Sequence, residues 1–567
     1  MKYGLTLLVI VAAVIFLFVR GLWDEKKKRV DDARKLRAAY GRRPEKKRRS
    51  VKREVAVMQG RFTIDEITWR ELDMDAVFAR MDYTLSSAGE NYLYKALHHP
   101  ARCEKEAVRW EAVAGYFAAH HQERVQVQLL LAEIGRETGP SLSAWLSMMK
   151  EEQGKSVAAE YAVNMIYVFA GLAALRDTAA GIFLFAAVAV FQIVTYFHRR
   201  AQVLPCLSGV AEMMRALRGA EKLRRILPSA LWEEAEQTAG ISLVDGIRKL
   251  RPLKRHCFWV LQCKSAGSHP LSLPGDYARM LFHFDLIQFR KLKHKMLSLE
   301  PELLAIYDTI GYVDSAISIA MYRASLREWS LPVLRTAAEQ MPAGQSGLSM
   351  EEGYHPLIED AVAGSIEVCG SQGVLITGSN ASGKSTFLKM TALNLLLAQT
   401  IHTALAKRFS APFSRIYTAM RAEDDIGRGE SSYMAEILSL KRVLDAGRQK
   451  EPFPVFCFID EILRGTNTVE RIAASAHILR SFRPPLVYCF AATHDRELMV
   501  LTRKQYDAYY FDEEVRDGQL FFPYRLRRGI AGTGNAIRLL AEAGYDREIT
   551  EGAAAQVEDF LKEGVWR

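Results

Sequence analysis

Hydrophobic positions are spread unevenly along this chain, and their spacing divides it into three kinds of segment. The first kind is a block of almost continuous apolar residues, found at residues 5–19, extending to about Trp23, and again at residues 161–197. Such a block predicts a helix that crosses a membrane, because about 20 residues span the hydrocarbon core. The second block is broken by Arg176-Asp177, so it predicts two arms joined by a tight turn.

The second kind of segment has apolar residues at helical spacing, and the third has short β-rich runs. Helical spacing extends from Thr63 to Pro100 with a turn at residues 86–89, from Glu104 to Met149, and from Leu207 to Leu334. From Gly347 onward, strand-like apolar runs alternate with helices. This alternation is typical of an α/β domain.

The charges beside the N-terminal block favour an uncleaved anchor over a cleaved signal peptide. A secretory signal has its positive charge before the apolar run and a small-residue cleavage site after it. Here one lysine precedes the run, whereas 16 Lys/Arg lie between Arg20 and Arg53. Because positive residues stay on the cytoplasmic side, we expect Met1 outside and Lys26 onward in the cytoplasm. A cleaved signal is the alternative.

Charge also supports a membrane hairpin at residues 156–200. Lys155 and Arg199-Arg200 would lie on the cytoplasmic side, with Arg176-Asp177 as the external turn. A buried helical hairpin inside a soluble domain would give a similar pattern and is the alternative. With three spans, the expected location is the cell membrane, multi-pass, with the N-terminus outside and the bulk of the chain cytoplasmic.

Net charge points to one short segment as a binding surface. The chain carries a formal charge of +10, and the stretch from Arg20 to Arg53 alone carries +11, from 16 basic and 5 acidic residues. The remainder nets −1, so its charge gives no support for DNA binding. We expect the basic stretch to contact anionic membrane lipid, with DNA as the second choice. The seven cysteines include no CxxC pair, which favours reduced thiols over disulfides or a zinc site.

The segment from Gly373 to Thr386 has the pattern of a phosphate-binding loop. An apolar strand enters a glycine-rich turn, and Lys-Ser-Thr then opens an apolar helix. Glycines let backbone N–H groups surround phosphate oxygens, Lys384 would neutralise the β- and γ-phosphates, and Ser385 would bind Mg²⁺. The predicted cofactors are therefore ATP and Mg²⁺, and the predicted cofactor-binding residues of this loop are Gly378, Asn380, Gly383, Lys384, Ser385 and Thr386.

Two further buried strands end in residues that suit hydrolysis. The run Val455–Ile459 precedes Asp460 and Glu461 in the Walker B arrangement, in which Asp460 holds Mg²⁺ and Glu461 polarises the attacking water. The run Leu486–Ala492 delivers His494 at its carboxyl end, where ligands bind in parallel sheets, although a lone histidine is ordinarily structural. The predicted catalytic residues are Glu461, His494 and Lys384, and the predicted metal ligands are Ser385 and Asp460.

A polar, glycine-bearing loop lies between these motifs, from Glu423 to Glu436, and leads into a helix with Ser431 near its cap. One interpretation is an ordinary capping motif. The other is a second helix N-terminus that meets a phosphate across a dimer interface. On this second interpretation, Ser431 contacts ATP in trans.

In this order, the motifs resemble those of the MutS family of ABC-type ATPases. The family's phosphate loop, of the form Gly-Pro-Asn-Met-Gly-Gly-Lys-Ser-Thr, is similar to residues 378–386, and its signature loop, Gly-Arg-Ser-Thr-Phe-Met-x-Glu, is similar at residues 431–436. Its Asp-Glu-Ile-Gly-Arg-Gly-Thr resembles residues 460–466, and its Ala-Thr-His matches residues 492–494. Its Gly-Arg-His-Pro-Leu resembles residues 353–357.

The resemblance implies an ATPase that dimerises through its nucleotide domains and associates with DNA. The tail at residues 529–554 resembles the family's C-terminal dimerisation element, and the helical segments resemble its core and lever more loosely. The family's mismatch readers also carry an N-terminal domain with a Phe-x-Glu wedge. Here the N-terminus is an anchor and a basic linker, and the one Phe-x-Glu, Phe511–Glu513, follows the histidine loop.

The expected fold class is an α/β P-loop ATPase domain of the ABC type, preceded by an all-α core and lever domain, with N-terminal and internal transmembrane helices. The expected domains are a transmembrane anchor at residues 1–23, a polybasic linker at 24–60, the first half of the helical core at 61–155, a transmembrane hairpin at 156–200, the second half of the core and lever at 201–345, and the ATPase domain with dimerisation helices at 346–567.

Two functions follow from this organisation. The first is a membrane-anchored, MutS-like ATPase that works as a homodimer and is associated with DNA, without mismatch-reading residues. The alternative is an ABC-type mechano-ATPase that acts on a membrane or protein partner with no DNA role. A transporter has less support, since three spans make a poor pathway, and intact motif residues speak against an inactive scaffold.

Overall fold

The computed structural model divides into two compact units, Met1–Met58, Asp82–Lys95 and Ala112–Ala324 in the first, and Gln59–Met81, Ala96–Glu111 and Ser325–Arg567 in the second. Segment 61–155 thus contributes to both units. The structure describes residues 2–563 except for 45–61, 137–141, 152–156, 240–241, 255–256, 258–279, 337–345, 370–371, 380–381, 421–431, 450, 465, 513, 517–518, 531–536, 538–539 and 542–543.

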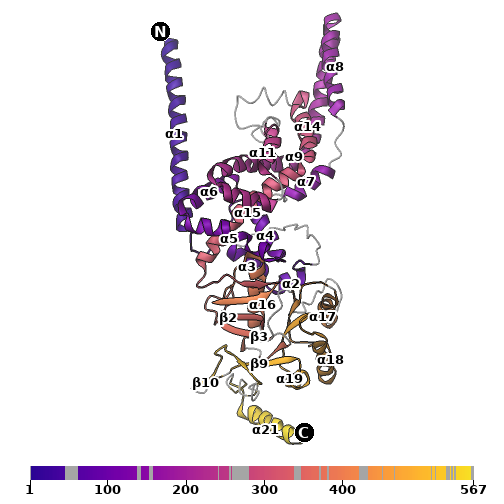
Figure 1. Cartoon of the computed structure of the whole chain (residues 1–567). Helices are drawn as coiled ribbons and strands as arrows, with labels where there is room; N and C mark the ends of the chain where they lie inside the picture. Colours follow the sequence, from indigo (N-terminus) through magenta and orange to yellow (C-terminus); the bar gives the residue numbers. More distant parts are fainter. Residues whose placement is uncertain are drawn as a thin grey trace. The chain divides into compact units, whose positions relative to one another are not determined.

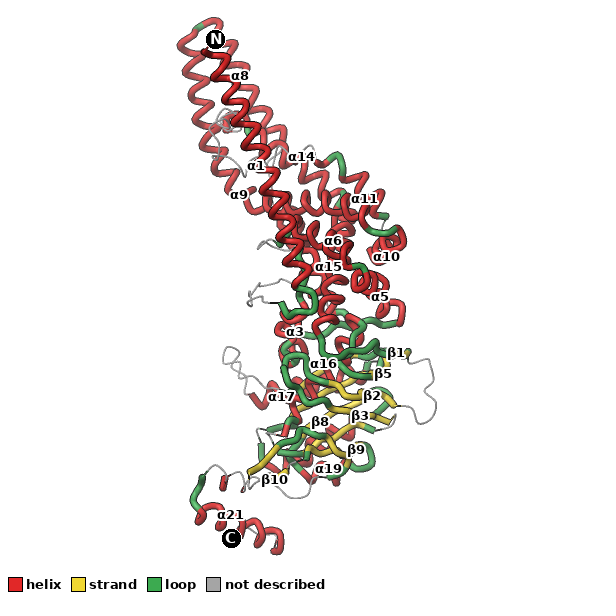
Figure 2. The backbone as a smooth tube through the Cα atoms, turned by 90° about the vertical axis from the view of Figure 1, so that its left-hand side faces the viewer, coloured by secondary structure: helices red, strands yellow, loops and turns green. Residues whose placement is uncertain are grey.

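Among the described residues, the first unit is built from helices and every strand lies in the second (Figure 2). The helices of the first unit are α1 (Lys2–Ala38), α6 (His121–Ile134), α7 (Leu142–Glu151), α8 (Val157–Arg176), α9 (Thr178–Ile226), α10 (Ser229–Ala239), α11 (Leu243–Leu250), α14 (Phe284–Ser298) and α15 (Glu300–Ser325). Helices α4 (Ser87–His98) and α5 (Glu104–Ala119) contribute residues to both units.

Helix α1 continues without a break from the expected anchor into the basic stretch (Figure 1). Most of the charged residues between Trp23 and Ala38 are lysine and arginine, which favour helix, and they outweigh the three aspartates of this stretch. The first part of the expected linker is therefore helical as far as Ala38. On α1, Arg29 lies 3.5 Å from Glu133 of α6.

Helix α15 is the buried centre of the first unit. It is long and apolar enough to cross a membrane, but 89% of its apolar stretch is buried, as in the core helix of a soluble domain. Its Asp314 accepts hydrogen bonds from the Ser86 N–H (2.8 Å) and hydroxyl (2.6 Å). The expected turn at residues 86–89 is wrong: Ser87–Gly89 are the first residues of α4, and Ser86 caps it, because the Ser86 hydroxyl oxygen accepts from the Gly89 N–H at 3.0 Å.

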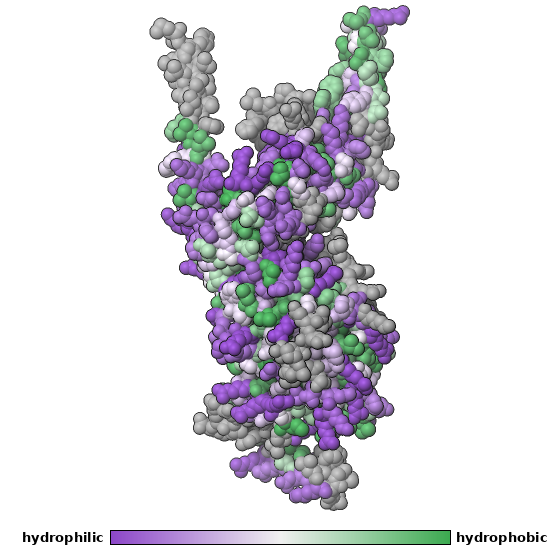
Figure 3. Space-filling model, viewed as in Figure 1, coloured by the Kyte–Doolittle hydropathy of each residue, from purple (hydrophilic) through white to green (hydrophobic). Residues whose placement is uncertain are grey.

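Helices α8 and α9 form a hairpin that exposes many apolar side chains around its turn. Asp177 joins them and caps α9, since its carboxylate accepts hydrogen bonds from the N–H groups of Ala179 (3.0 Å) and Ala180 (3.2 Å). The stretch Thr178–Ala201 is long and apolar enough to cross a membrane, and 22% of it is buried. Figure 3 shows this hydrophobic surface in green near the top of the molecule. The most exposed large apolar side chains include Phe169, Leu172, Leu175, Ile182, Phe183, Val190 and Val194.

A polar cluster near the base of the hairpin joins its two arms to α14. The Gln192 amide on α9 donates to Asn164 on α8 at 3.1 Å. His283, which precedes α14, contacts the Gln192 carbonyl oxygen through Nε2 at 2.9 Å. The Tyr196 hydroxyl donates to the carboxylate of Asp285 at 2.8 Å, so these buried polar groups satisfy one another.

The second unit is an α/β domain with two main sheets. The larger has the order β12-β9-β4-β8-β7-β6, the smaller has β1-β5-β2-β3, and β10 pairs with β11. The strands are β1 (Val333–Arg335), β2 (Ser346–Gly353), β3 (Gly364–Cys369), β4 (Gly373–Thr377), β5 (Arg408–Pro412), β6 (Arg415–Ala419), β7 (Val455–Asp460), β8 (Val487–Ala492), β9 (Tyr506–Phe511), β10 (Glu514–Arg516), β11 (Gln519–Phe521) and β12 (Leu526–Arg528).

The central strands of the larger sheet are parallel and fully buried, which explains why they are continuous apolar runs in the sequence. The helices of this unit are α2 (Glu66–Glu71), α3 (Met74–Met81), α16 (Lys384–Ile401), α17 (Ser432–Arg448), α18 (Thr468–Ser481), α19 (Arg496–Thr502) and α21 (Arg547–Glu563). One core cluster includes Val443 of α17, Cys457 of β7 and Cys489 of β8, and both cysteines are free thiols.

An early part of the chain packs on the larger sheet. Helix α2 lies against β6, where the Thr418 N–H donates to the Thr68 hydroxyl at 3.3 Å. Asp65, which caps α2, also forms an ion pair with Arg442 of α17 at 2.6 Å. Residues 59–81 therefore belong structurally with the C-terminal domain, although nothing in their sequence pattern indicates it.

Candidate nucleotide site

Three neighbouring parallel strands bring the predicted motifs to one edge of the larger sheet. Their order is β4, β8 and β7, and they end in the phosphate loop, the Thr-His pair and the Asp-Glu pair, respectively. Hydrogen bonds continue past the strand ends: the Thr493 N–H donates to the Ile376 carbonyl, and the Glu461 N–H donates to the Ala492 carbonyl, both at 2.9 Å. The carboxyl ends of parallel strands are where ligands bind in open α/β sheets.

The phosphate loop has the backbone of a cradle. Gly378 has φ of +146° and Gly383 has φ of +98°, in the region that favours glycine. Lys384 is the first residue of α16, and its buried ammonium donates to the carbonyls of Gly378 and Ser379, each at 2.7 Å. The lysine thus lies across the loop, with its charge where the β- and γ-phosphates of a bound nucleotide would lie.

Ser385 and Asp460 face each other across the ends of β4 and β7. Burial raises the pKa of Asp460, while a hydrogen bond with Ser385 and the charges of Arg464 and Lys384 act in the opposite direction. A hydroxyl and a carboxylate are oxygen ligands that Mg²⁺ accepts, with phosphate and water completing its shell. Among the described residues, no group of three or more His, Cys, Asp or Glu is arranged so that it could hold a metal ion by itself, so Ser385 and Asp460 remain the two side chains assigned to Mg²⁺.

The predicted general base lies between two basic side chains. Glu461 adopts a left-handed backbone conformation, with φ of +58°. Its carboxylate forms an ion pair with Arg464 at 2.7 Å and lies 3.6 Å from Nδ1 of His494. His494 is half exposed, and its Nε2 lies 3.6 Å from Asp495. The structure therefore brings Glu461 and His494 together, and it adds Arg464, which also reaches Asp460 at 3.9 Å.

Glu436 of α17 holds the turn that follows Asp460 and Glu461. Its carboxylate accepts hydrogen bonds from the backbone N–H of Leu463 and, at 3.2 Å, from that of Arg464. Burial raises the pKa of Glu436, whereas these two hydrogen bonds lower it, so they favour the charged form. Helix α17, which contains most of the signature run at residues 431–436 and is called the signature helix below, is thus bound to the Walker B turn through the Glu436 carboxylate.

Two predicted site residues, Asn380 and Ser431, lie outside the described residues. Thr386 is exposed on the first turn of α16, two residues beyond Lys384. The remaining predicted residues, Gly378, Gly383, Lys384, Ser385, Asp460, Glu461 and His494, lie at the shared edge of β4, β8 and β7.

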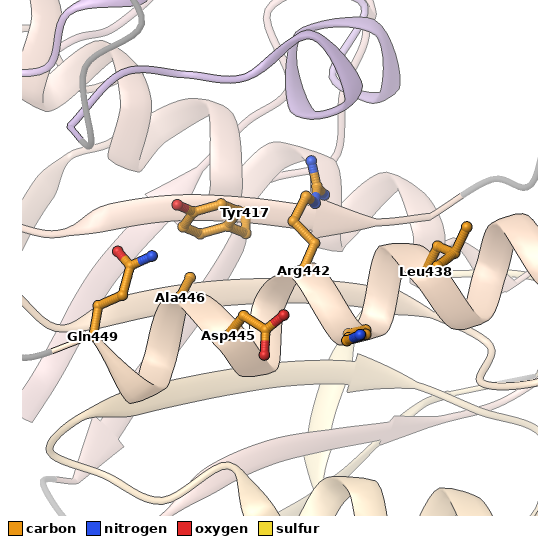
Figure 4. A pocket seen from close by; sticks show the side chains of 7 residues that line it. Tyr417, Leu438, Arg442, Asp445, Ala446 and Gln449 are labelled. Carbon is orange, nitrogen blue, oxygen red and sulfur yellow. The ribbon is translucent and has the colours of Figure 1, made fainter.

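An open cavity of about 440 Å³ lies between β6 and α17, away from these motifs. Figure 4 shows the Tyr417 ring on β6 with Arg442 beside it, and the guanidinium carbon lies 5.5 Å from the ring centroid. The lining residues are Tyr417, Leu438, Lys441, Arg442, Asp445, Ala446 and Gln449. None of them belongs to the phosphate loop or to Walker B, so this cavity is not the place for the triphosphate.

Comparison with known proteins identifies the domain that carries this geometry. The family model of MutS domain V matches residues 374–561, which contain the phosphate loop, the Asp-Glu pair and the Thr-His pair. Residues 374–561 are a MutS domain V. This is an ATPase domain of the ABC type, as the motifs predict, and an α-helical region precedes it in this chain.

The relatives found share this part of the chain. The DNA mismatch repair protein MutS of Thermus thermophilus is 30% identical over 212 residues, which are 37% of this chain and 26% of that protein. The MutS of Lawsonia intracellularis is 29% identical over 278 residues, 47% of this chain and 30% of the relative. The DNA mismatch repair protein MutS 2 of Haloarcula marismortui is 28% identical over 275 residues, 44% and 28% of the two chains. The chain therefore spans less than a third of the length of these relatives.

Three residues near the domain V site have contacts that the sequence does not predict. Arg464 lies in residues 460–466, which resemble the family's Asp-Glu-Ile-Gly-Arg-Gly-Thr, but the sequence does not show its ion pair with Glu461. Glu436 closes the signature run, yet nothing in the spacing shows which backbone groups it binds. Tyr524 has no motif at all: its Cδ1 lies 2.9 Å from where a Cβ on Gly383 would be, so its ring covers that glycine.

Proposed function

We propose that this chain is a membrane-anchored ATPase that binds and hydrolyses Mg²⁺-ATP as a homodimer through its domain V. The observation that carries the proposal is the convergence of Lys384, Ser385, Asp460 and Glu461 at the adjacent ends of β4, β8 and β7. Phosphoryl transfer requires positioning and charge neutralisation more than covalent chemistry. A buried lysine, a hydroxyl–carboxylate pair and a second carboxylate supply these.

Each side chain has a distinct task in this proposal. Mg²⁺, when bound, supplies charge neutralisation at the phosphate oxygens. Lys384 exchanges its two carbonyl contacts for phosphate oxygens, and Ser385 and Asp460 hold the metal. Glu461 orients water and takes a proton from it, for which its carboxylate must leave Arg464. His494, 3.6 Å from Glu461, donates toward the γ-phosphate or the water.

The dimer is proposed from the resemblance of the signature run rather than from a contact in this chain. Ser431 would complete the ATP site of the partner subunit from the N-terminal end of α17. That end carries the positive pole of a helix of 17 residues, which suits an anion. The relatives named above are DNA mismatch repair proteins, so we propose that the helical unit of this chain associates with DNA.

Membrane anchoring is proposed from the outward-facing apolar hairpin and from the sequence of the N-terminal helix. Leu175 and Phe183 are 85% and 76% exposed near the turn of the hairpin, where burial in lipid would be favourable. The basic residues that follow the N-terminal apolar block would then face anionic headgroups. This is tested by reconstituting the full chain with liposomes, washing with carbonate and sedimenting the vesicles. Recovery of the protein in the soluble fraction would contradict membrane anchoring.

The catalytic assignment is tested by Glu461→Gln in the full chain. The amide keeps the shape but cannot accept a proton, so we expect ATP binding within about threefold of the parent and turnover reduced about 10²-fold or more. Glu470→Gln is the matched control, because Glu470 is an exposed glutamate on the first turn of α18. Parental turnover by Glu461→Gln would show that the Walker B assignment is wrong.

A second function, force transmission to a membrane or protein partner without DNA, is favoured by the near-neutral charge outside the basic stretch. Titration of duplex, branched and mismatched DNA at two salt concentrations, with the ATPase rate as readout, separates the two. Salt-dependent binding that persists when the basic residues between Lys26 and Arg53 are replaced by glutamine supports DNA association. Binding that disappears with them indicates nonspecific attraction and favours the second function.

A further inference from the structure

The turn after the Walker B strand has an unusual backbone. Glu461 and Leu463, two residues apart, both have φ of +58°, a conformation that side-chain-bearing residues rarely adopt. At the position of Leu463, the resembling family run Asp-Glu-Ile-Gly-Arg-Gly-Thr has a glycine, for which this conformation carries no steric cost. In this chain a leucine adopts a backbone conformation that suits glycine, so contacts with the surrounding structure must stabilise the turn.

Two kinds of contact stabilise the turn, and both involve residues of α17. The Leu463 side chain is 3% exposed and packs in the cluster that contains Leu440 and Val443 of α17. The carboxylate of Glu436, also on α17, accepts the backbone N–H groups of Leu463 and Arg464. A backbone in a sparsely populated conformation persists where the surroundings fix it in this way.

The same turn determines where the two reactive side chains lie. Glu461 is part of it, and Arg464, whose N–H is bound by Glu436, forms the 2.7 Å ion pair with Glu461. A displacement of α17 would therefore move the Glu436 carboxylate and, through it, the backbone of Leu463 and Arg464. The Arg464 side chain, which forms the ion pair with Glu461, would move with that backbone. Each step from α17 to Glu461 is thus a direct contact: Glu436 binds the backbone of Leu463 and Arg464, and Arg464 pairs with Glu461.

We propose that Glu436 is a positioning residue for ATP hydrolysis, which sets the place of Glu461 according to the position of the signature helix α17. The inference rests on the proposed function, since Glu461 must be the general base. It makes α17 the element through which an event at its N-terminal end, such as the arrival of a second copy of the chain, controls turnover. Glu436 itself would not touch nucleotide.

The test compares nucleotide affinity with turnover in the full chain, reconstituted in lipid. Glu436→Ala removes both acceptors, and Glu436→Gln keeps one oxygen but presents an amide N–H₂ to the other backbone N–H. Asp445→Ala is the matched control, because Asp445 is an acid on the same helix whose ion pair is a 4.0 Å contact with exposed Arg448. Fluorescent ATP reports the Kd, phosphate release reports kcat, and the melting temperature reports folding.

We expect Glu436→Ala to bind ATP within about threefold of the parent, while kcat falls about 10- to 100-fold. Glu436→Gln should lie between the two, and Asp445→Ala should match the parent. An unchanged kcat in folded Glu436→Ala overturns the inference, as does a Kd that weakens as much as kcat falls, because that is a general structural defect. If Glu436→Ala does not fold, the same criteria apply to Glu436→Gln. A parent without turnover overturns the proposed function, and this inference with it.

Discussion

His355 makes the stability of the second unit depend on pH in a way that can be measured. It follows the end of β2, its side chain is 6% exposed, and its Nδ1 accepts a hydrogen bond from the Leu357 N–H at 3.2 Å. A proton on Nδ1 would place two donors against each other. Burial lowers the pKa of His355 to about 4, and the charge of Lys389 adds to this, while Asp73, which pairs with Lys389 at 2.6 Å, opposes it.

The magnitude follows from the difference between the folded and unfolded pKa. The unfolded histidine has its ordinary pKa of 6.5, whereas the folded pKa is about 4. Because the folded pKa is depressed, the stabilisation is fully present above pH 6.5 and is lost as the pH falls toward 4. The unfolded chain binds a proton in this window that the folded chain does not. Each unit of pKa difference corresponds to about 1.4 kcal/mol, so the unfolding free energy falls by about 3 kcal/mol over this window.

The assay is urea unfolding of the full chain in mild detergent, followed by tryptophan fluorescence, at several pH values from 7.5 to about 4. His355→Gln removes the titrating group while keeping a side chain of similar size. Carboxylates titrate in both proteins, so the difference between parent and variant isolates the histidine. His477→Gln, on an exposed face of α18, is the control for the loss of any histidine.

We expect the unfolding free energy of the parent to fall by about 3 kcal/mol more than that of His355→Gln between pH 7 and pH 4. His477→Gln should follow the parent. Equal losses in the parent and in His355→Gln would refute the reasoning, because they would mean that this imidazole accepts a proton in the folded state as readily as in water.

Two further predictions concern packing. Gly89→Ala should destabilise the first unit by about 3 kcal/mol in thermal unfolding, because the new Cβ would lie 2.2 Å from the Asp314 carboxylate and displace it from its hydrogen bonds. Gly115→Ala on α5, where a Cβ meets nothing within 4 Å, should instead stabilise by up to about 1 kcal/mol, and a loss equal to that of Gly89→Ala would contradict the argument. Trp110→Phe should cost about 1–3 kcal/mol in urea unfolding, since it leaves the buried Thr400 carbonyl without its 2.8 Å donor; no change would show that the bond contributes nothing.

The sequence predicts those parts of the molecule that depend on local order. The phosphate loop, Asp460 and the Thr493-His494 pair each come after an apolar run, and neighbouring parallel strands bring such ends together, so the site could be predicted from the sequence. The helical character of the first unit is visible in the same way, in the spacing of apolar residues.

What the sequence does not predict depends on tertiary contacts. A helix begins at Ser87 because the Ser86 hydroxyl accepts a hydrogen bond from the Gly89 N–H, although Ser-Ser-Ala-Gly has the composition of a turn. Asp65 caps a short helix that packs on the ATPase sheet, and its partner Arg442 lies hundreds of residues away. Glu436 is another such case, because its binding to the Leu463 backbone requires a left-handed turn at a leucine, which no propensity would suggest.

Helix α9 runs for 49 residues without interruption, about 70 Å at 1.5 Å per residue. Its first half carries the outward apolar surface, and its second half is fastened to neighbouring helices, for example by the Trp145 indole, which donates to the Cys206 carbonyl at 2.9 Å, and by the 2.7 Å ion pair of Lys222 with Glu133. Pro205 lies between the two halves of α9 and has no N–H to donate to the Ala201 carbonyl, so the helix can bend there. If the apolar half of α9 lies in a bilayer, as we propose, bending at Pro205 would let that half follow the membrane while these contacts hold the polar half in place.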